Sequence, residues 1–267
     1  MGAAAARVRI RALDLVIDLE LDAVLGAALA PLISTYERTD APAGVRFRAV
    51  REPQPTLYRN DELWLSAGSD SELLSLLEGE LYRDIVRAAE RAPLLHASAV
   101  SQSGRALVMA GRSGVGKSTL ALALLERGAR YLSEEWVAFD ADGRVRGVAR
   151  PLHFDESPSA TATKRTGPAE RRSCIVTLPE QQIERASVWP AALVLLDRVS
   201  SHVGELARLT PGQTLAALEG QFLQLGPDPL QAVVALVAGV PGYRLTFSDK
   251  ESACSLLAPL FAYGRAG

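Results

Sequence analysis

Apolar and polar positions alternate along the first third of the chain with the periods of both strands and helices. Residues 45–50, Val-Arg-Phe-Arg-Ala-Val, alternate strictly and predict a strand with one exposed face. Asn60-Asp61 is a turn signal between two short apolar stretches and predicts a hairpin. Ser69 can cap a helix that ends before Pro93. We therefore predict a small α+β unit over residues 1–92, with one or two strands in 8–21, strands at 45–50, 56–59 and 62–66, and helices at 22–33 and 72–92.

From residue 93 onward, apolar runs of strand length alternate with longer stretches of helical spacing. Residues 106–110 form one such run, and residues 119–127 carry Leu and Ala at helical spacing and stop at Gly128. This order of elements predicts an α/β domain over residues 93–267. Further strands are expected at 191–196 and 243–247, and further helices at 211–224, at 228–238 and from about 250.

Composition and charge describe an ordinary globular protein. The 267 residues include 29 Lys and Arg against 31 Asp and Glu, so no basic excess argues for a nucleic-acid partner. No apolar run approaches about eighteen residues and no signal-peptide pattern opens the chain, so neither membrane insertion nor export is expected and the predicted location is the cytoplasm. Cys174 and Cys254 lack metal-ligand spacing and are expected to be reduced thiols.

One motif predicts nucleotide binding. Residues 111–118, Gly-Arg-Ser-Gly-Val-Gly-Lys-Ser, match the phosphate-binding pattern G-x-x-x-x-G-K-[ST] between a predicted strand and a predicted helix. The glycines of this motif let backbone N–H groups face phosphate oxygens. Lys117 should bridge the β- and γ-phosphates, and the Ser118 hydroxyl should hold Mg²⁺. The expected ligands are ATP and Mg²⁺, and the alternative is a plain glycine-rich turn. The predicted nucleotide-binding residues are Gly111, Arg112, Ser113, Gly114, Val115, Gly116, Lys117, Ser118 and Thr119.

Three acids could complete a phosphoryl-transfer site. Glu134 and Glu135 follow the loop helix, at the end of a predicted strand that returns beside the loop strand. Adjacent residues of a strand point to opposite faces, so at most one of these acids faces the γ-phosphate unless the strand breaks there. A solvated acidic turn is the alternative. Asp197 ends the apolar strand at 191–196 and is either a second Mg²⁺-linked acid or a simple strand-end acid.

A histidine and its spacing connect these features to a family. His96 lies fifteen residues before Gly111 and, taken alone, is either a buried structural histidine or a catalytic one. The stretch from His96 to Phe139 resembles HPr kinase/phosphorylase and the bacterial HPr-kinase-related proteins. It shares with them the histidine, the loop Gly-x-Ser-Gly-x-Gly-Lys-Ser, an Ala/Leu helix, the pair Arg127-Gly128 and two adjacent acids.

The resemblance implies a P-loop kinase core of the HPr kinase/phosphoenolpyruvate carboxykinase type and phosphorylation of a hydroxyl by a nucleoside triphosphate. Carried over residue by residue, Glu135 matches the acid that deprotonates the acceptor hydroxyl, and Glu134 matches its neighbour. Lys117 and Ser118 match the phosphate lysine and the Mg²⁺ ligand. His96 matches the family histidine near the transferred phosphate, so the implied catalytic residues are Glu135, His96 and Lys117, and the metal ligands are Ser118, Glu134 and Asp197.

Three departures from the family pattern narrow the expected activity. Aspartates stand in the family where this chain has Glu134 and Glu135, and glutamate stands where it has Thr119. The later family segment that serves phosphorolysis has only Arg146-Gly147 as its counterpart, with no preceding acid. We therefore expect neither the reverse phosphorylase reaction nor HPr itself as the substrate.

The acceptor is expected to be a peptide or a small protein. Related kinases include tailoring enzymes that phosphorylate a serine or threonine of a ribosomal peptide precursor. Residues 156–173 contain almost no apolar residue beyond alanine and predict a mobile loop. Its basic cluster is either a solvated surface or a docking site for the peptide. The cluster consists of Lys164, Arg165, Arg171 and Arg172.

Two other functions remain open at this point. One is a nucleotide sensor with little catalysis that controls a partner through loop ordering, which the replaced aspartates favour. The other is a kinase of a small hydroxylated molecule. The sequence also leaves open whether copies of the chain associate with one another.

Overall fold

The computed structural model has a mixed α/β fold and describes residues 6–89, 92–148, 150–154, 162–166, 173–201, 204–224 and 229–262. The chain divides into two compact units: residues 1–89 with 150–178, and residues 90–149 with 179–267. This differs from the predicted division after residue 92, which placed 150–178 in the second unit. At the start of this segment, the Arg150 guanidinium pairs with Glu78 at 3.2 Å and lies over the Tyr82 ring at 5.0 Å, both of which belong to helix α2 (Asp70–Ala88).

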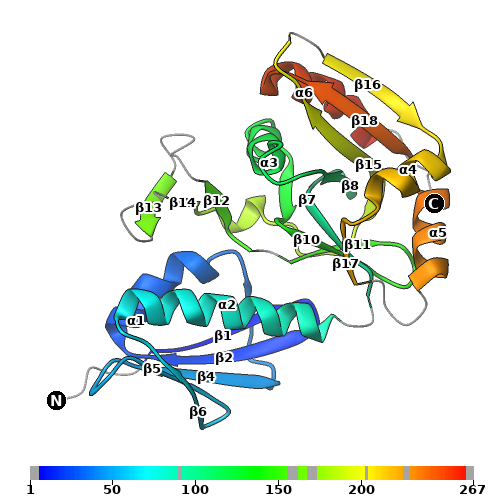
Figure 1. Cartoon of the computed structure of the whole chain (residues 1–267). Coiled ribbons are helices and arrows are strands. Elements are labelled where there is room, and N and C mark those ends of the chain that lie inside the picture. The colour runs from blue at the N-terminus through cyan, green and yellow to red at the C-terminus, as the bar shows by residue number, and fades with distance from the viewer. Residues whose placement is uncertain are drawn as a thin grey trace. The chain divides into compact units, whose positions relative to one another are not determined.

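The first unit contains a six-stranded sheet with two helices on one face (Figure 1). The predicted strands, hairpin and helices of this region are confirmed. Helix α1 begins after Asp22, whose carboxylate accepts from the Val24 and Leu25 amides at 2.9 Å, and α2 begins after Ser69. The strand order is β3-β1-β2-β4-β5-β6. The elements are β1 (Ala6–Ala12), β2 (Leu15–Leu21), α1 (Ala23–Leu29), η1 (Ala30–Ile33), β3 (Glu37–Arg38), β4 (Val45–Val50), β5 (Thr56–Arg59), β6 (Glu62–Ser66) and α2 (Asp70–Ala88).

A small three-stranded sheet corrects part of the loop predicted over residues 156–173: residues 162–166 form a strand and residue 173 begins another, whereas 156–161 and 167–172 lie outside the described residues. Strands β12 (Leu152–Phe154), β14 (Ser173–Val176) and β13 (Ala162–Thr166) pair in the order β12-β14-β13. Backbone hydrogen bonds to β14 hold β13 even though its residues are polar or small. Lys164 and Arg165 lie on β13, but their side chains, and Arg171 and Arg172 altogether, lie outside the described residues.

The second unit is built on a nine-stranded sheet in which three neighbouring strands run parallel (Figure 1). The order is β11-β10-β7-β8-β15-β18-β16, with β9 and β17 also paired to β7. Parallel β8, β15 and β18 end at one edge, the usual place for ligands in such sheets. The strands are β7 (Leu94–Gln102), β8 (Arg105–Ala110), β9 (Arg130–Ser133), β10 (Trp136–Phe139), β11 (Val145–Gly147), β15 (Trp189–Arg198), β16 (Gly204–Leu209), β17 (Phe222–Gln224) and β18 (Gly242–Phe247).

The helices of this unit are α3 (Lys117–Leu125), α4 (Pro211–Leu218), α5 (Pro229–Gly239) and α6 (Lys250–Leu257), with short turns η2 (Glu180–Gln182) and η3 (Ala258–Ala262). Buried side chains of α4 and α5, such as Leu218 and Leu236, pack on the sheet core around Leu193. None of the helices in the described parts of the chain is both long enough and apolar enough to cross a membrane.

Two predictions for this unit need correction. Strand β9 pairs with β7 and not with the loop strand β8, because β7 and β15 already occupy the two edges of β8. The helix predicted over 211–224 ends at Leu218, because Gly220 takes a positive φ of 76° and the chain continues as β17. The strands predicted at 191–196 and 243–247 and the helices at 228–238 and from 250 are confirmed.

Candidate functional site

Residues 111–118, here called the glycine loop, connect β8 to α3 with the backbone conformation that only glycine adopts freely. Gly111, Gly114 and Gly116 have φ values of 154°, 77° and 107°. A Cβ on Gly111 would lie 3.2 Å from the Leu196 carbonyl oxygen and 3.1 Å from Val115 Cγ1. Glycine at the first position therefore lets the loop pass closely over the end of β15.

The backbone amides of the glycine loop are available to an anion. Among the described residues, no group accepts a hydrogen bond from the amides of Gly114, Gly116, Lys117 or Ser118. Lys117 and Ser118 open α3, so their amides also carry the positive end of the helix dipole. Unpaired amides and a helix N-terminus at a glycine turn are the usual ingredients of a phosphate site.

Lys117 folds back over the glycine loop. Its side chain is almost fully buried, and its ammonium group donates to the Gly111 carbonyl at 2.8 Å and to the Arg112 carbonyl at 3.4 Å. Burial lowers the pKa of Lys117, while Glu134 and Glu135 act in the opposite direction. The lysine is thus held at the loop, with two carboxylates close enough to influence its charge.

Glu134 is a buried carboxylate held by two serine hydroxyls. The Ser118 hydroxyl donates to Oε1 at 2.5 Å, and the Ser98 hydroxyl of β7 donates to Oε2 at 2.9 Å. The residue is only 8% exposed, and burial raises the pKa of its carboxyl group against the effect of the two hydrogen bonds. Two predicted metal ligands, Ser118 and Glu134, are therefore in direct contact.

Glu135 occupies a strained turn that interrupts the returning strand. Strand β9 ends at Ser133 and β10 begins at Trp136. Glu135 has a φ of 68°, and the Trp136 amide donates to the Glu134 carbonyl at 2.9 Å across it, which defines a γ-turn of the rare positive-φ kind. The rule that adjacent strand residues face opposite sides therefore does not apply to these two acids. Backbone strain at a half-buried acid is typical of functional sites.

His96 lies in the same cluster of charges. Its half-buried ring packs on Trp136 with ring centroids 5.2 Å apart. Burial lowers the pKa of His96, the nearby Lys117 ammonium lowers it further, and Glu135 opposes both. Burial and the neighbouring ammonium group therefore both disfavour the charged imidazolium form of His96. The predicted catalytic residues His96, Lys117 and Glu135 are thus within electrostatic reach of one another.

Asp197 stands apart from this cluster. It is exposed near the end of β15, and its carboxylate forms no hydrogen bond or ion pair with the described residues. It directly follows Leu196, whose carbonyl lies close to Gly111, so the backbone runs beside the glycine loop. Its role as a metal ligand stays a prediction. In the described part of the chain, no group of three or more His, Cys, Asp or Glu side chains could hold a metal alone. Mg²⁺ does not need such a group of protein ligands where the phosphates of a nucleotide supply further oxygens.

Two residues that support the site were missed in the sequence. Ser98 is completely buried in the apolar strand β7, and its polarity in that setting was the only signal that it contacts a polar partner. Gly147 of β11 lies against β9, where a Cβ would come within 1.6 Å of the Leu132 carbonyl oxygen. In the sequence, the only signal for this region was the pair Arg146-Gly147, the counterpart of the later family segment.

The Glu134→Gln variant should be more stable than the wild type without ligand but should bind Mg·ATP poorly. A carboxyl group with a raised native pKa contributes stability below its ordinary value of about 4.5, and this is lost as the pH rises through the native pKa. Glutamine keeps partners for both serines without the buried charge, so we expect the melting temperature at neutral pH to rise by a few degrees. Affinity for Mg·ATP should fall about tenfold or more.

Thermal unfolding between pH 4 and 8 and calorimetric titration with Mg·ATP measure the two effects. The stability gain should shrink toward pH 4, where the wild-type carboxyl group is protonated in both states. A gain that did not depend on pH would contradict the electrostatic explanation.

Comparison with known proteins adds little. No family model matches the chain, and no curated protein matches it. Among solved structures, the HPr(Ser) kinase/phosphatase from Coxiella burnetii aligns with 63% of this chain and 93% of its own, at 11% sequence identity and a TM-score of 0.31. At this TM-score the alignment does not establish a common fold.

Proposed function

We propose that the chain is an ATP-dependent kinase that transfers the γ-phosphate to a serine or threonine hydroxyl of a peptide or small protein. The second unit would be a P-loop kinase core of the HPr kinase/phosphoenolpyruvate carboxykinase type. One observation carries the proposal: the buried Glu134 carboxylate is bound to Ser118 of the glycine loop, directly beside a second acid held in a strained turn. A protein that only bound phosphates would need the loop but not the second acid.

The residues present fit a magnesium ion. Ser118 and Glu134 offer a hydroxyl and a carboxylate oxygen, the hard donors that Mg²⁺ prefers, and they already touch each other. When bound with ATP, Mg²⁺ neutralises charge on the phosphates and helps to orient them. Ser98 fixes the other oxygen of Glu134 and so holds the carboxylate in a single orientation.

The remaining residues act on the acceptor and on the transferred charge. Lys117 and the loop amides stabilise negative charge on the phosphoryl oxygens. Glu135 accepts the proton of the attacking hydroxyl, and its turn sets the direction in which the side chain leaves the backbone, which matters because phosphoryl transfer depends mainly on positioning. His96, whose pKa is lowered by burial and by Lys117, can offer a hydrogen bond near the transferred phosphate.

Incubation with Mg·ATP and acceptors, followed by mass spectrometry, tests the proposal. The acceptors are peptides with a single Ser or Thr, matched peptides with Ala at that position, and the free amino acids serine and threonine. We expect one added phosphate on the hydroxyl peptides and none on the alanine peptides. Transfer only to the free amino acids would indicate a small-molecule kinase. ATP binding without transfer to any acceptor would instead indicate the nucleotide sensor.

A further inference from the structure

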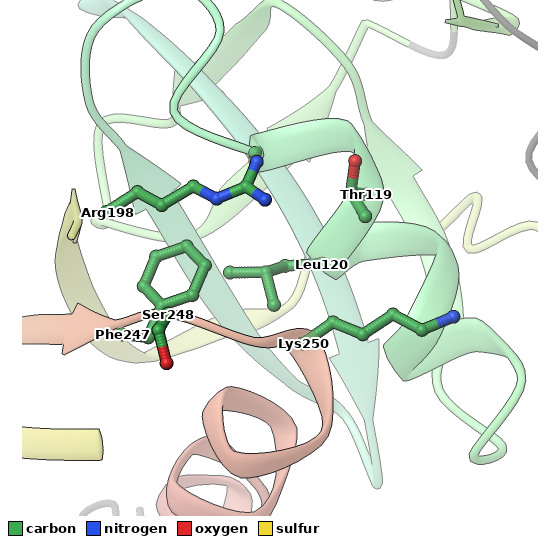
Figure 2. A pocket seen from close by; sticks show the side chains of 7 residues that line it. Thr119, Leu120, Arg198, Phe247, Ser248 and Lys250 are labelled. Atoms are coloured by element: carbon green, nitrogen blue, oxygen red, sulfur yellow. The ribbon is translucent and has the colours of Figure 1, made fainter. Parts of the chain in front are cut away.

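A small pocket, here called the side pocket, opens beside the first turn of α3. It lies between that turn, which contributes Gly116 and Thr119 to its lining, and the carboxyl ends of β15 and β18. Figure 2 shows Thr119 facing this space. Its volume is about 140 Å³. A cavity of about 150 Å³ is known to accept a benzene ring, so the side pocket has room for one six-membered ring of a base but not for a whole nucleotide. The other lining residues are Leu120, Arg198, Phe247, Ser248 and Lys250.

The position of the side pocket follows from the strand order. Strand β8 and the glycine loop stand between β7 and β15. The acids and His96 come from β7 and from the turn between β9 and β10, on one side of β8. The side pocket is formed by the ends of β15 and β18, on the other side. The two candidate sites therefore flank the glycine loop.

A nucleotide in the glycine loop would have a defined direction. The loop of this motif surrounds the α- and β-phosphates, with the lysine at the β- and γ-phosphates. Ser118 donates a hydrogen bond to Glu134, and Lys117 interacts electrostatically with the same carboxylate. The γ-phosphate of a bound nucleotide therefore belongs on the side of the acids. The nucleoside end must then leave the loop on the opposite side, where the side pocket lies.

The chemistry of the side pocket suits a nucleobase. Leu120 and Phe247 are buried, and their side chains point toward each other and form an apolar wall near the Arg198 side chain (Figure 2). The Arg198 and Lys250 side chains form no hydrogen bond or ion pair within the described part of the chain. A flat heteroaromatic ring uses an apolar wall and a stacking guanidinium together.

We infer that the side pocket binds the nucleobase of the donor nucleotide, with Arg198 stacked on the ring. This inference rests on the proposed function, because it assumes a nucleoside triphosphate in the glycine loop. It adds a set of specificity residues, from the ends of β15 and β18, that the phosphate-binding motif does not contain.

Comparing ATP with inorganic triphosphate tests the inference. Both ligands carry three phosphates, but only ATP has a base, so calorimetric titration with Mg²⁺ and each ligand isolates the contribution of the base. The Arg198→Ala variant should bind Mg·ATP about tenfold more weakly, while its affinity for triphosphate should stay within about twofold of the wild type.

Arg244→Ala is the matched control. Arg244 is an exposed arginine of β18 that does not line the side pocket, so its loss removes the same charge and should leave both affinities unchanged. Equal weakening of ATP and triphosphate in Arg198→Ala would overturn the inference, because it would indicate a phosphate contact. Unchanged ATP affinity in Arg198→Ala would overturn it as well. If the wild-type protein binds triphosphate as tightly as ATP, the base site is refuted but the proposed function is not. If the wild-type protein binds neither ligand, the proposed function is refuted as well.

Discussion

Replacing Glu135 by glutamine is expected to slow phosphate transfer from ATP by a factor of about 10² to 10⁴ while leaving the affinity for Mg·ATP nearly unchanged. A general base of this kind typically contributes that factor, and an amide cannot accept the proton of the attacking hydroxyl. Glutamine has the same length and meets the same positive φ at this position, so the γ-turn should persist. Single-turnover transfer of labelled phosphate to a hydroxyl peptide measures the rate, and calorimetry measures the affinity.

Two further variants make this experiment specific. Glu126→Gln removes an exposed carboxylate at the end of α3 and should transfer phosphate at the wild-type rate. Glu135→Asp keeps the base but shortens it by one methylene, so we expect an intermediate rate, because transfer depends on position. Wild-type transfer in Glu135→Gln would show that Glu135 is not the base. Loss of nucleotide affinity in the same variant would place Glu135 in binding and not in proton transfer.

Local patterns in the sequence were sufficient for much of the fold. The hairpin from Thr56 to Ser66 and the strand Val45–Val50 were predicted to the residue, because a turn signal and a strict alternation act over a few neighbours. The glycine loop was found in the same way, since its positive φ values require glycine at fixed positions.

Local sequence patterns could not predict contacts between residues that are far apart in the sequence. The contact between Ser98 and Glu134 joins residues 36 positions apart, and no local signal connects them. Pairing of β9 with β7 likewise depends on which sheet edges are free once β15 has joined β8. The polar composition of β13 predicted a loop, because the segment becomes a strand only through its backbone pairing with β14, which lies elsewhere in the sequence.

The turn at Glu135 shows why the site itself was only partly predictable. Glutamate rarely adopts a positive φ, so nothing in its own preference predicts a γ-turn. The turn is held instead by its surroundings. The Ser133 hydroxyl lies within hydrogen-bond distance of the Trp136 carbonyl, and the Ala97 amide donates to the Glu135 carbonyl at 3.0 Å. The residues that impose the strain are therefore on β7, β9 and β10, and the sequence alone did not bring them together.

Replacing Gly147 by alanine is expected to be strongly destabilising and to damage the site from a distance. The new Cβ would lie 1.6 Å from the Leu132 carbonyl oxygen and 3.2 Å from Ser133 Cβ, so the backbone of β9 must move. The next residue, Val148, donates its amide to the Ser133 hydroxyl at 2.9 Å, and this contact would be disturbed as well. Because overpacking against backbone cannot be relieved by a rotamer change, we expect a loss of about 3 kcal/mol or more and a melting temperature lower by roughly 6–12 °C.

The matched control for this substitution is Gly239→Ala at the end of α5, where a Cβ would meet nothing within 4 Å and the melting temperature should change little. Urea unfolding gives the free energy, and titration with Mg·ATP shows whether the remaining folded protein still binds nucleotide. We expect weaker binding, because displacement of Leu132 and Ser133 moves the Glu134 carboxylate away from Ser118. If Gly147→Ala were as stable as the wild type, β11 would not pack on β9 as closely as described. If it were unstable but bound Mg·ATP with full affinity, the position of Glu134 would not depend on this contact.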